Sequence, residues 1–246
     1  MDKLIKNIGE LSEKIDLNKR FKWNGWIDDF TNSDLFTQQE KNRILENESS
    51  FAKNIALKKV LNEKFTKEAN TDLAFWYIQK WGGIANFKEK NAAIINSAIE
   101  KSLNHEYLTE LTNISSLSKV TSVVDIENQI IYDSRVVYAF NWLILKRFDG
   151  NMKFFPIPTG RSSIASNFDI GTIINFKFHN RFDEKNLYFE PKQSYKQFCK
   201  IIKLLNSAIY GNFKQEPFRL EMLLFAAFEE EIIKDVKGSI KVDLKI

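Results

Sequence analysis

The stretch ISSLSKVTSVVDIENQIIYDSRVVYAFNWLIL, from Ile114 to Leu145, decides what kind of fold this chain takes. It predicts two helices, near residues 117–125 and 133–147, joined by a tight loop and an extended apolar segment that ends at Asp133. The second helix has apolar residues nearly all the way round, which is typical of a helix buried at the centre of a domain. We therefore expect the rest of the chain to pack around it.

Asp133 stands where the N-cap of this central helix belongs. Its side chain can accept hydrogen bonds from the N–H groups of the first helical turn, which fixes the carboxylate in place. The positive end of the helix dipole favours its ionised form. One interpretation is that Asp133 is only a cap, and another is that it is a catalytic carboxylate held in position by the cap.

Helical periodicity extends outward from this stretch over most of the chain. The expected helices cover residues 1–17, 38–66 with a break near 47–50, 70–81, 88–103, 105–113, 194–209 and 217–236. Short strands are plausible at 173–178 and 239–246. The sequence thus predicts an all-α fold, a multi-helix bundle with at most a few short strands. We expect a single domain over 1–246, with possible lobes of 1–147 and 148–246.

Composition excludes several classes of protein. The chain has one cysteine, Cys199, so it forms no intrachain disulfide, and its two histidines make a His/Cys zinc site improbable. There is neither an apolar run of ~18 residues nor a signal-peptide pattern at the N-terminus. We expect a cytoplasmic protein, nucleoid-associated if bacterial, without membrane contact, bound metal or cofactor. The GxSxG, HExxH and GxGxxG motifs are absent.

Positive charge is concentrated in one region. Between Arg135 and Phe182 there are seven bases and two acids, whereas the net charge of the whole chain is only +4. Such a basic field suits a nucleic-acid backbone, although it also suits a solvated surface. Lys146, Arg147 and Arg161 are the DNA-binding candidates from this region. Arg161 follows Thr159 and Gly160 in the loop FFPIPTGRSS (154–163), which is otherwise interpreted as a surface turn.

The central stretch resembles the helix-hairpin-helix DNA glycosylase superfamily, which includes the 8-oxoguanine-glycosylase fold. In that superfamily a helix, a hairpin and a second helix lead into a buried segment ending in Asp, followed by a small or polar residue, a base and a hydrophobe. IIYDSRVVYA matches that ending, and ISSLSKVTSVV resembles the hairpin and second helix, with Leu108 and Leu111 in the preceding helix. Serines 115, 116 and 118 stand where the family hairpin usually has glycines.

The resemblance implies a DNA glycosylase that removes a damaged or modified base, for repair or for defence against modified foreign DNA. Asp133 would be the catalytic carboxylate. Lys119 would attack C1′ and form a Schiff base, or else neutralise a phosphate. Ser116 and Ser118 would contact the DNA backbone. The partner would be DNA, and the target base and oligomeric state stay open.

Other candidates flank these residues. Arg135 would pair with a phosphate or with an acid on a neighbouring helix. Tyr132, Trp76 and Trp81 are candidates for a base pocket, because aromatic rings stack on bases, although at helical spacing such rings are more commonly core. Glu221, within an apolar helix, is a possible buried acid with a structural role. The competing functions are a non-catalytic DNA-binding protein of the same fold and a helical interaction module.

Overall fold

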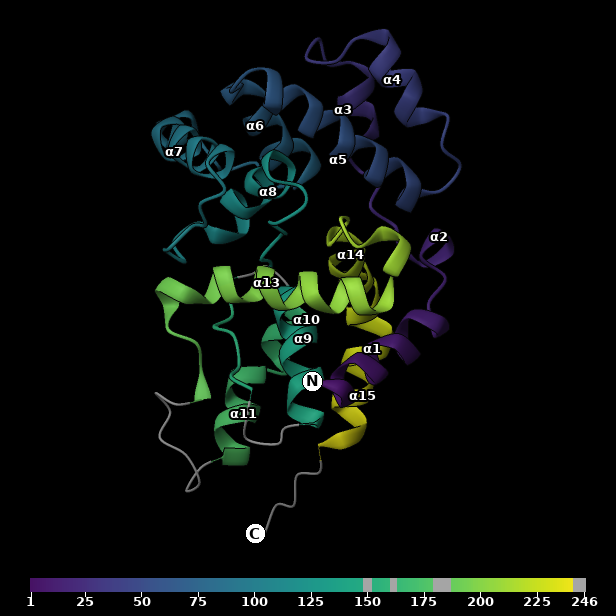
Figure 1. Cartoon of the computed structure of the whole chain (residues 1–246), viewed down its shortest axis with the longest axis vertical. Coiled ribbons are helices and arrows are strands. Elements are labelled where there is room, and N and C mark those ends of the chain that lie inside the picture. The colour runs from purple at the N-terminus through teal and green to yellow at the C-terminus, as the bar shows by residue number, and fades with distance from the viewer. Residues whose placement is uncertain (148–151, 160–162, 179–186, 241–246) are drawn as a thin grey trace.

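The computed structural model describes residues 1–147, 152–159, 163–178 and 187–240, and these form an all-α fold (Figure 1). No β-strand occurs within these ranges, where Phe154 and Tyr188 make an isolated bridge. The helical elements are α1 (Asp2–Lys14), α2 (Leu17–Arg20), α3 (Ile27–Thr31), α4 (Gln38–Leu45), α5 (Ser50–Lys67), α6 (Thr71–Trp76), η1 (Tyr77–Trp81), η2 (Glu89–Asn91), α7 (Ala92–Leu103), α8 (Ile114–Val124), α9 (Ser134–Lys146), α10 (Ser163–Asn167), α11 (Ile170–Phe178), α13 (Pro191–Ile209), η3 (Gly211–Phe213), α14 (Phe218–Ala227), η4 (Phe228–Ile232) and α15 (Ile233–Ser239).

Side-chain caps set several helix starts. Thr37 accepts from the backbone N–H of Glu40, whose side chain accepts from the N–H of Thr37, so α4 begins with a capping box. Ser49 caps α5 by accepting from Ala52 N–H, which produces the predicted break near residues 47–50. Asn70 caps α6 in the same way.

Two local predictions are wrong. Residues 105–113 form no helix, because His105 and Asn113 both take left-handed backbone angles with φ of 57°. Residues 173–178 belong to α11 instead of a strand. The β-branched pair at 172–173 favours extended structure locally, but the helix buries Ile170, Ile174 and Phe178 at a spacing of four. Within the expected strand at 239–246, residues 241–246 lie outside the described ranges.

The central position expected for α9 is confirmed. Every residue of α9 from Val136 to Leu145 is buried. The helix packs against α1, α11, α14 and η4. Within the described residues, no helix is both long and apolar enough to cross a lipid bilayer.

The helices gather in two groups (Figure 1). Helices α3 to α8 form the first, and α1 lies with α9, α11, α13 and α15 in the second, where it packs on α13 and α9. These two groups of helices differ from the possible lobes 1–147 and 148–246, because the N-terminal helix α1 and α9 both lie with the C-terminal helices. The junction between the groups contains the candidate site.

Candidate functional site

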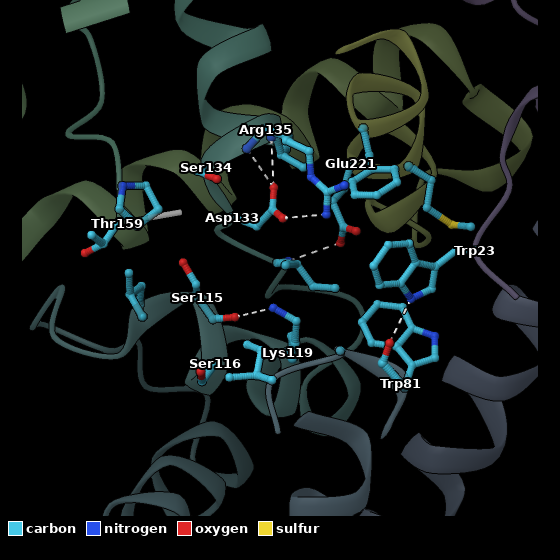
Figure 2. Close-up of a pocket in the computed structure, with 18 of the residues that line it drawn as sticks. Trp23, Trp81, Ser115, Ser116, Lys119, Asp133, Ser134, Arg135, Thr159 and Glu221 are labelled. Atoms are coloured by element: carbon cyan, nitrogen blue, oxygen red, sulfur yellow. Dashed lines mark hydrogen bonds and ion pairs between the residues drawn. The ribbon is translucent and has the colours of Figure 1, made fainter. Parts of the chain in front are cut away.

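A pocket of about 680 Å³ lies where the two groups meet. Helix α5, η1 and the start of α8 contribute its walls from one group, and the start of α9 together with α14 contributes them from the other. This volume is within the range of about 300–1,000 Å³ that is usual for ligand sites. Figure 2 shows Asp133, Lys119, Glu221 and two tryptophans arranged around the same cavity.

Two helix N-termini face this pocket. Residues 113–116, at the start of α8, and 133–136, at the start of α9, all line it. The first-turn N–H groups and the helix dipole give each terminus a partial positive charge. The Asp133 carboxylate already meets this charge at α9, so a ligand with negative charge, such as a phosphate, is favoured at the start of α8.

The two carboxylate oxygens of Asp133 make different contacts. Its Oδ1 accepts hydrogen bonds from the backbone N–H groups of Arg135 (2.9 Å) and Val136 (3.0 Å), which makes it the predicted N-cap of α9. Its Oδ2 has a longer contact, 3.4 Å, with a guanidinium nitrogen of Arg135. The cap thus fixes the side chain while Oδ2 remains beside the pocket (Figure 2).

The Arg135 guanidinium is held between Asp133 and two aromatic rings. Its central carbon lies 4.0 Å from the ring centroid of Phe225 and 5.5 Å from that of Trp23. These cation–π contacts fix the guanidinium inside the pocket wall. The acid that pairs with Arg135 is Asp133, in its own helix turn. We call Asp133 and Arg135 the outer pair; their side chains are 15% and 26% exposed.

Lys119 reaches the pocket from the second turn of α8. Its Nζ donates a hydrogen bond to the carbonyl oxygen of Ser115 (Figure 2). Gly82 makes room for the lysine stem, since a Cβ at this position would lie 2.8 Å from Lys119 Cδ and Cε and 2.5 Å from the carbonyl oxygen of Ile78. The absence of a side chain at residue 82 therefore positions Lys119.

Of the three aromatic candidates for a base pocket, only Trp81 lines the pocket. Its backbone carbonyl accepts from the indole N–H of Trp23, at 2.9 Å. Trp76 instead packs in the core against Phe30 and Phe36. Tyr132 also lies outside the pocket lining, fully buried, and its hydroxyl donates to the carbonyl oxygen of Pro156. Burial raises the pKa of Tyr132 far above its ordinary value. The structure thus gives Trp76 and Tyr132 places in the core.

The serines at the hairpin positions, Ser115, Ser116 and Ser118, also differ in where their side chains lie. All three lie inside α8, whose start follows the left-handed Asn113, a residue type that tolerates the conformation a glycine would supply. Ser116 lines the pocket. Ser118 is fully buried, and its hydroxyl accepts from the backbone N–H of Tyr132, which ties the extended segment to α8. Ser118 is therefore unable to touch DNA in this conformation.

Lys146 and Arg147 lie at the end of α9 that is far from the pocket. Lys146 ends α9, about 20 Å from Asp133 at 1.5 Å per residue, and pairs with Asp235 at 2.7 Å. Arg147 is the exposed C-cap of the same helix. Thr159 lines the pocket, whereas Gly160 and Arg161 lie outside the described residues. Within the described ranges, no cluster of His, Cys, Asp and Glu is suited to hold a metal ion.

A second charged pair, Lys58 and Glu221, lines the inner part of the pocket. We call it the inner pair, because its side chains are only 1% and 6% exposed, with Lys58 Nζ 3.6 Å from Glu221 Oε2. Sequence reasoning missed Lys58. The signal was present, since Lys58 occupies the apolar stripe of α5 together with Phe51, Leu61 and Phe65.

Comparisons of the chain with family models, curated proteins and solved structures found no match.

Proposed function

We propose that this protein is a DNA glycosylase that flips a damaged or modified base out of DNA and removes it. One observation carries the proposal: Asp133, fixed at the N-terminus of the buried helix α9, shares a pocket with Lys119. The resemblance of the segment around Asp133 to the helix-hairpin-helix glycosylases gives the same assignment.

The chemistry follows from the position of the carboxylate. A base inside a duplex is out of reach, so the enzyme must extrude it into a pocket such as this one. As the bond between C1′ and the base nitrogen breaks, its electron pair leaves with the base and positive charge develops on the sugar. Asp133 Oδ2 would stabilise that charge, and because the cap already fixes the side chain, little rearrangement is needed.

The surrounding groups fit a nucleic-acid strand. The start of α8 lines the pocket and would contact phosphates, with Ser116 beside it, whereas the Arg135 and Val136 N–H groups of α9 already donate to Asp133. Trp23 and Trp81 supply aromatic surface in the same pocket. A non-catalytic DNA-binding protein of this fold would not need an open cavity at Asp133, so the pocket supports the enzyme over that alternative.

Lys119 gives the proposal a second, separable part. If its amine attacks C1′ after losing a proton, the base departs and a Schiff base with the opened sugar follows. Borohydride reduction would then link the protein covalently to DNA. We expect a trapped adduct in the wild type and none with Lys119→Ala. A wild type that excises bases without an adduct would leave Lys119 with a phosphate-binding role only.

The direct test is incubation of the pure protein with plasmid and phage DNAs carrying different base modifications, followed by an assay for abasic sites. We expect abasic sites in at least one modified DNA and none with Asp133→Asn. A matched control is Asp169→Asn, since Asp169 accepts from Thr172 N–H near the start of α11 and does not line the pocket. Abasic sites in no DNA, despite tight binding, would favour the non-catalytic alternative.

A further inference from the structure

The inner pair is unusual because, within the described residues, its buried ammonium group has an ion pair but no hydrogen bond. Lys58 Nζ is completely buried and has no hydrogen-bond partner among the described residues. Its nearest anion, Glu221 Oε2, is 3.6 Å away, and the ring centroids of Trp81 and Phe218 lie 5.7 and 5.8 Å away. A buried ammonium normally has hydrogen bonds, so a polar partner is missing from this position.

Glu221 provides the complementary group. Its Oε2 accepts from the backbone N–H of Ile131, at 3.1 Å, whereas the described residues give Oε1 no hydrogen bond. Burial raises the pKa of Glu221 and lowers the pKa of Lys58, and each partner opposes the shift of the other. A donor and an acceptor thus stand side by side on the inner wall of the pocket.

This arrangement selects a particular ligand chemistry. A phosphate or carboxylate would meet the Glu221 carboxylate at the same place, so an anion is disfavoured there. A neutral ring edge that carries a carbonyl oxygen next to an N–H satisfies both residues, with the oxygen on Lys58 and the N–H on Glu221. Trp23 and Trp81 line the same pocket.

We propose that Lys58 and Glu221 recognise the lactam edge, the adjacent C=O and N–H, of a base held in the pocket. This edge occurs in uracil, thymine, guanine and hypoxanthine. Adenine and cytosine present an amino group next to a ring acceptor, so in the same ring orientation both hydrogen bonds are reversed. The identity of the ligand as a base rests on the proposed glycosylase function, whereas the preference for a lactam edge rests on the inner pair.

Binding of deoxynucleosides tests the preference without any DNA cleavage. Two matched pairs, deoxyinosine with deoxyadenosine and deoxyuridine with deoxycytidine, carry bases that differ at this edge, and the sugar limits which way round the ring enters. Titration of the intact protein followed by tryptophan fluorescence should give about ten-fold or greater tighter binding of the lactam member of each pair, since an unpaired buried polar group costs about 1–3 kcal/mol. Equal affinity within both pairs, or no binding of any deoxynucleoside, would overturn the proposal.

Variants connect the preference to the two residues. Lys58→Met should abolish it, and the control Lys59→Met, on the neighbouring residue whose side chain is 44% exposed, should leave it intact. If Lys58→Met does not fold, the double variant Lys58→Met/Glu221→Leu replaces both charges with apolar groups and should fold without the preference. A folded double variant that still prefers deoxyinosine and deoxyuridine would contradict the assignment.

Failure of the lactam-edge proposal and failure of the glycosylase proposal give different experimental results. A preference for lactam bases in a protein that makes no abasic sites would retain the inner pair as a recognition site and remove the enzyme. Base excision without any such preference would retain the enzyme and remove the role of Lys58 and Glu221.

Discussion

The outer pair and the inner pair each join one acid and one base in the same pocket, but the two pairs differ in their surroundings. Asp133 and Arg135 are partly exposed and satisfied by the first turn of α9 and by aromatic rings. Lys58 and Glu221 are buried, and the ammonium lacks a hydrogen bond within the described residues. The charge at the outer position is thus already fixed by the fold and available for chemistry. The inner pair is an ion pair whose ammonium has no hydrogen bond within the described residues, which suits recognition of a polar ligand.

The largest expected effect comes from separating the inner pair. Lys58→Met leaves Glu221 as a buried carboxylate without its cation, and breaking a buried pair in this way costs about 3–5 kcal/mol of unfolding free energy. Replacing both residues in Lys58→Met/Glu221→Leu should restore most of that stability. Denaturant unfolding of both variants measures the difference. A single variant as stable as the wild type would show that the pair is not coupled.

A smaller effect is expected at Gly82, which lines the same pocket. Ala at this position meets the Ile78 carbonyl and the Lys119 stem, so we expect a loss of about 1–3 kcal/mol from overpacking. Any Schiff-base trapping through Lys119 should fall as well. The control is Gly25→Ala, because a Cβ there meets no atom within 4 Å. Equal stability of the two variants would mean that the backbone at Gly82 shifts without cost.

The smallest effect is expected far from both pairs. Duplex DNA binding should weaken with added salt, and Lys146→Ala at the far end of α9 should lower the slope of log affinity against log salt by about 1 if Lys146 contacts a phosphate. Fluorescence anisotropy measures the slope. Lys6→Ala on α1 is the control, since Lys6 is exposed and outside the predicted contacts. An unchanged slope would leave Lys146 with only its ion pair to Asp235.

Local chemistry explains why much of the fold was predictable. Asp133 caps α9 as predicted, and Thr37 and Asn70 cap α4 and α6, because a cap depends on a few neighbouring residues. The helix expected at 105–113 does not form, and His105 and Asn113 at the two ends of this segment adopt left-handed backbone angles. Propensity at 173–178 was outweighed by burial of the apolar face of α11.

The site was predictable where its members come from one stretch of sequence. Asp133, Arg135, Ser116 and Lys119 all line the pocket because they follow the starts of α8 and α9. Trp76 ends α6 and Trp81 ends the π-helical turn η1, and the packing of that turn places only the second in the pocket wall. The inner pair joins α5 to α14 across 163 positions, and no local pattern records that contact.

The central claim is that Asp133 performs the chemistry, and Asp133→Asn under single-turnover conditions tests it most directly. The Asn side-chain oxygen still accepts from Arg135 and Val136 N–H, so the thermal melt and DNA binding should stay close to wild type. Losing the charge should slow base release by about 100-fold or more. Wild-type excision in a folded Asp133→Asn protein would contradict the account and leave Asp133 as a helix cap.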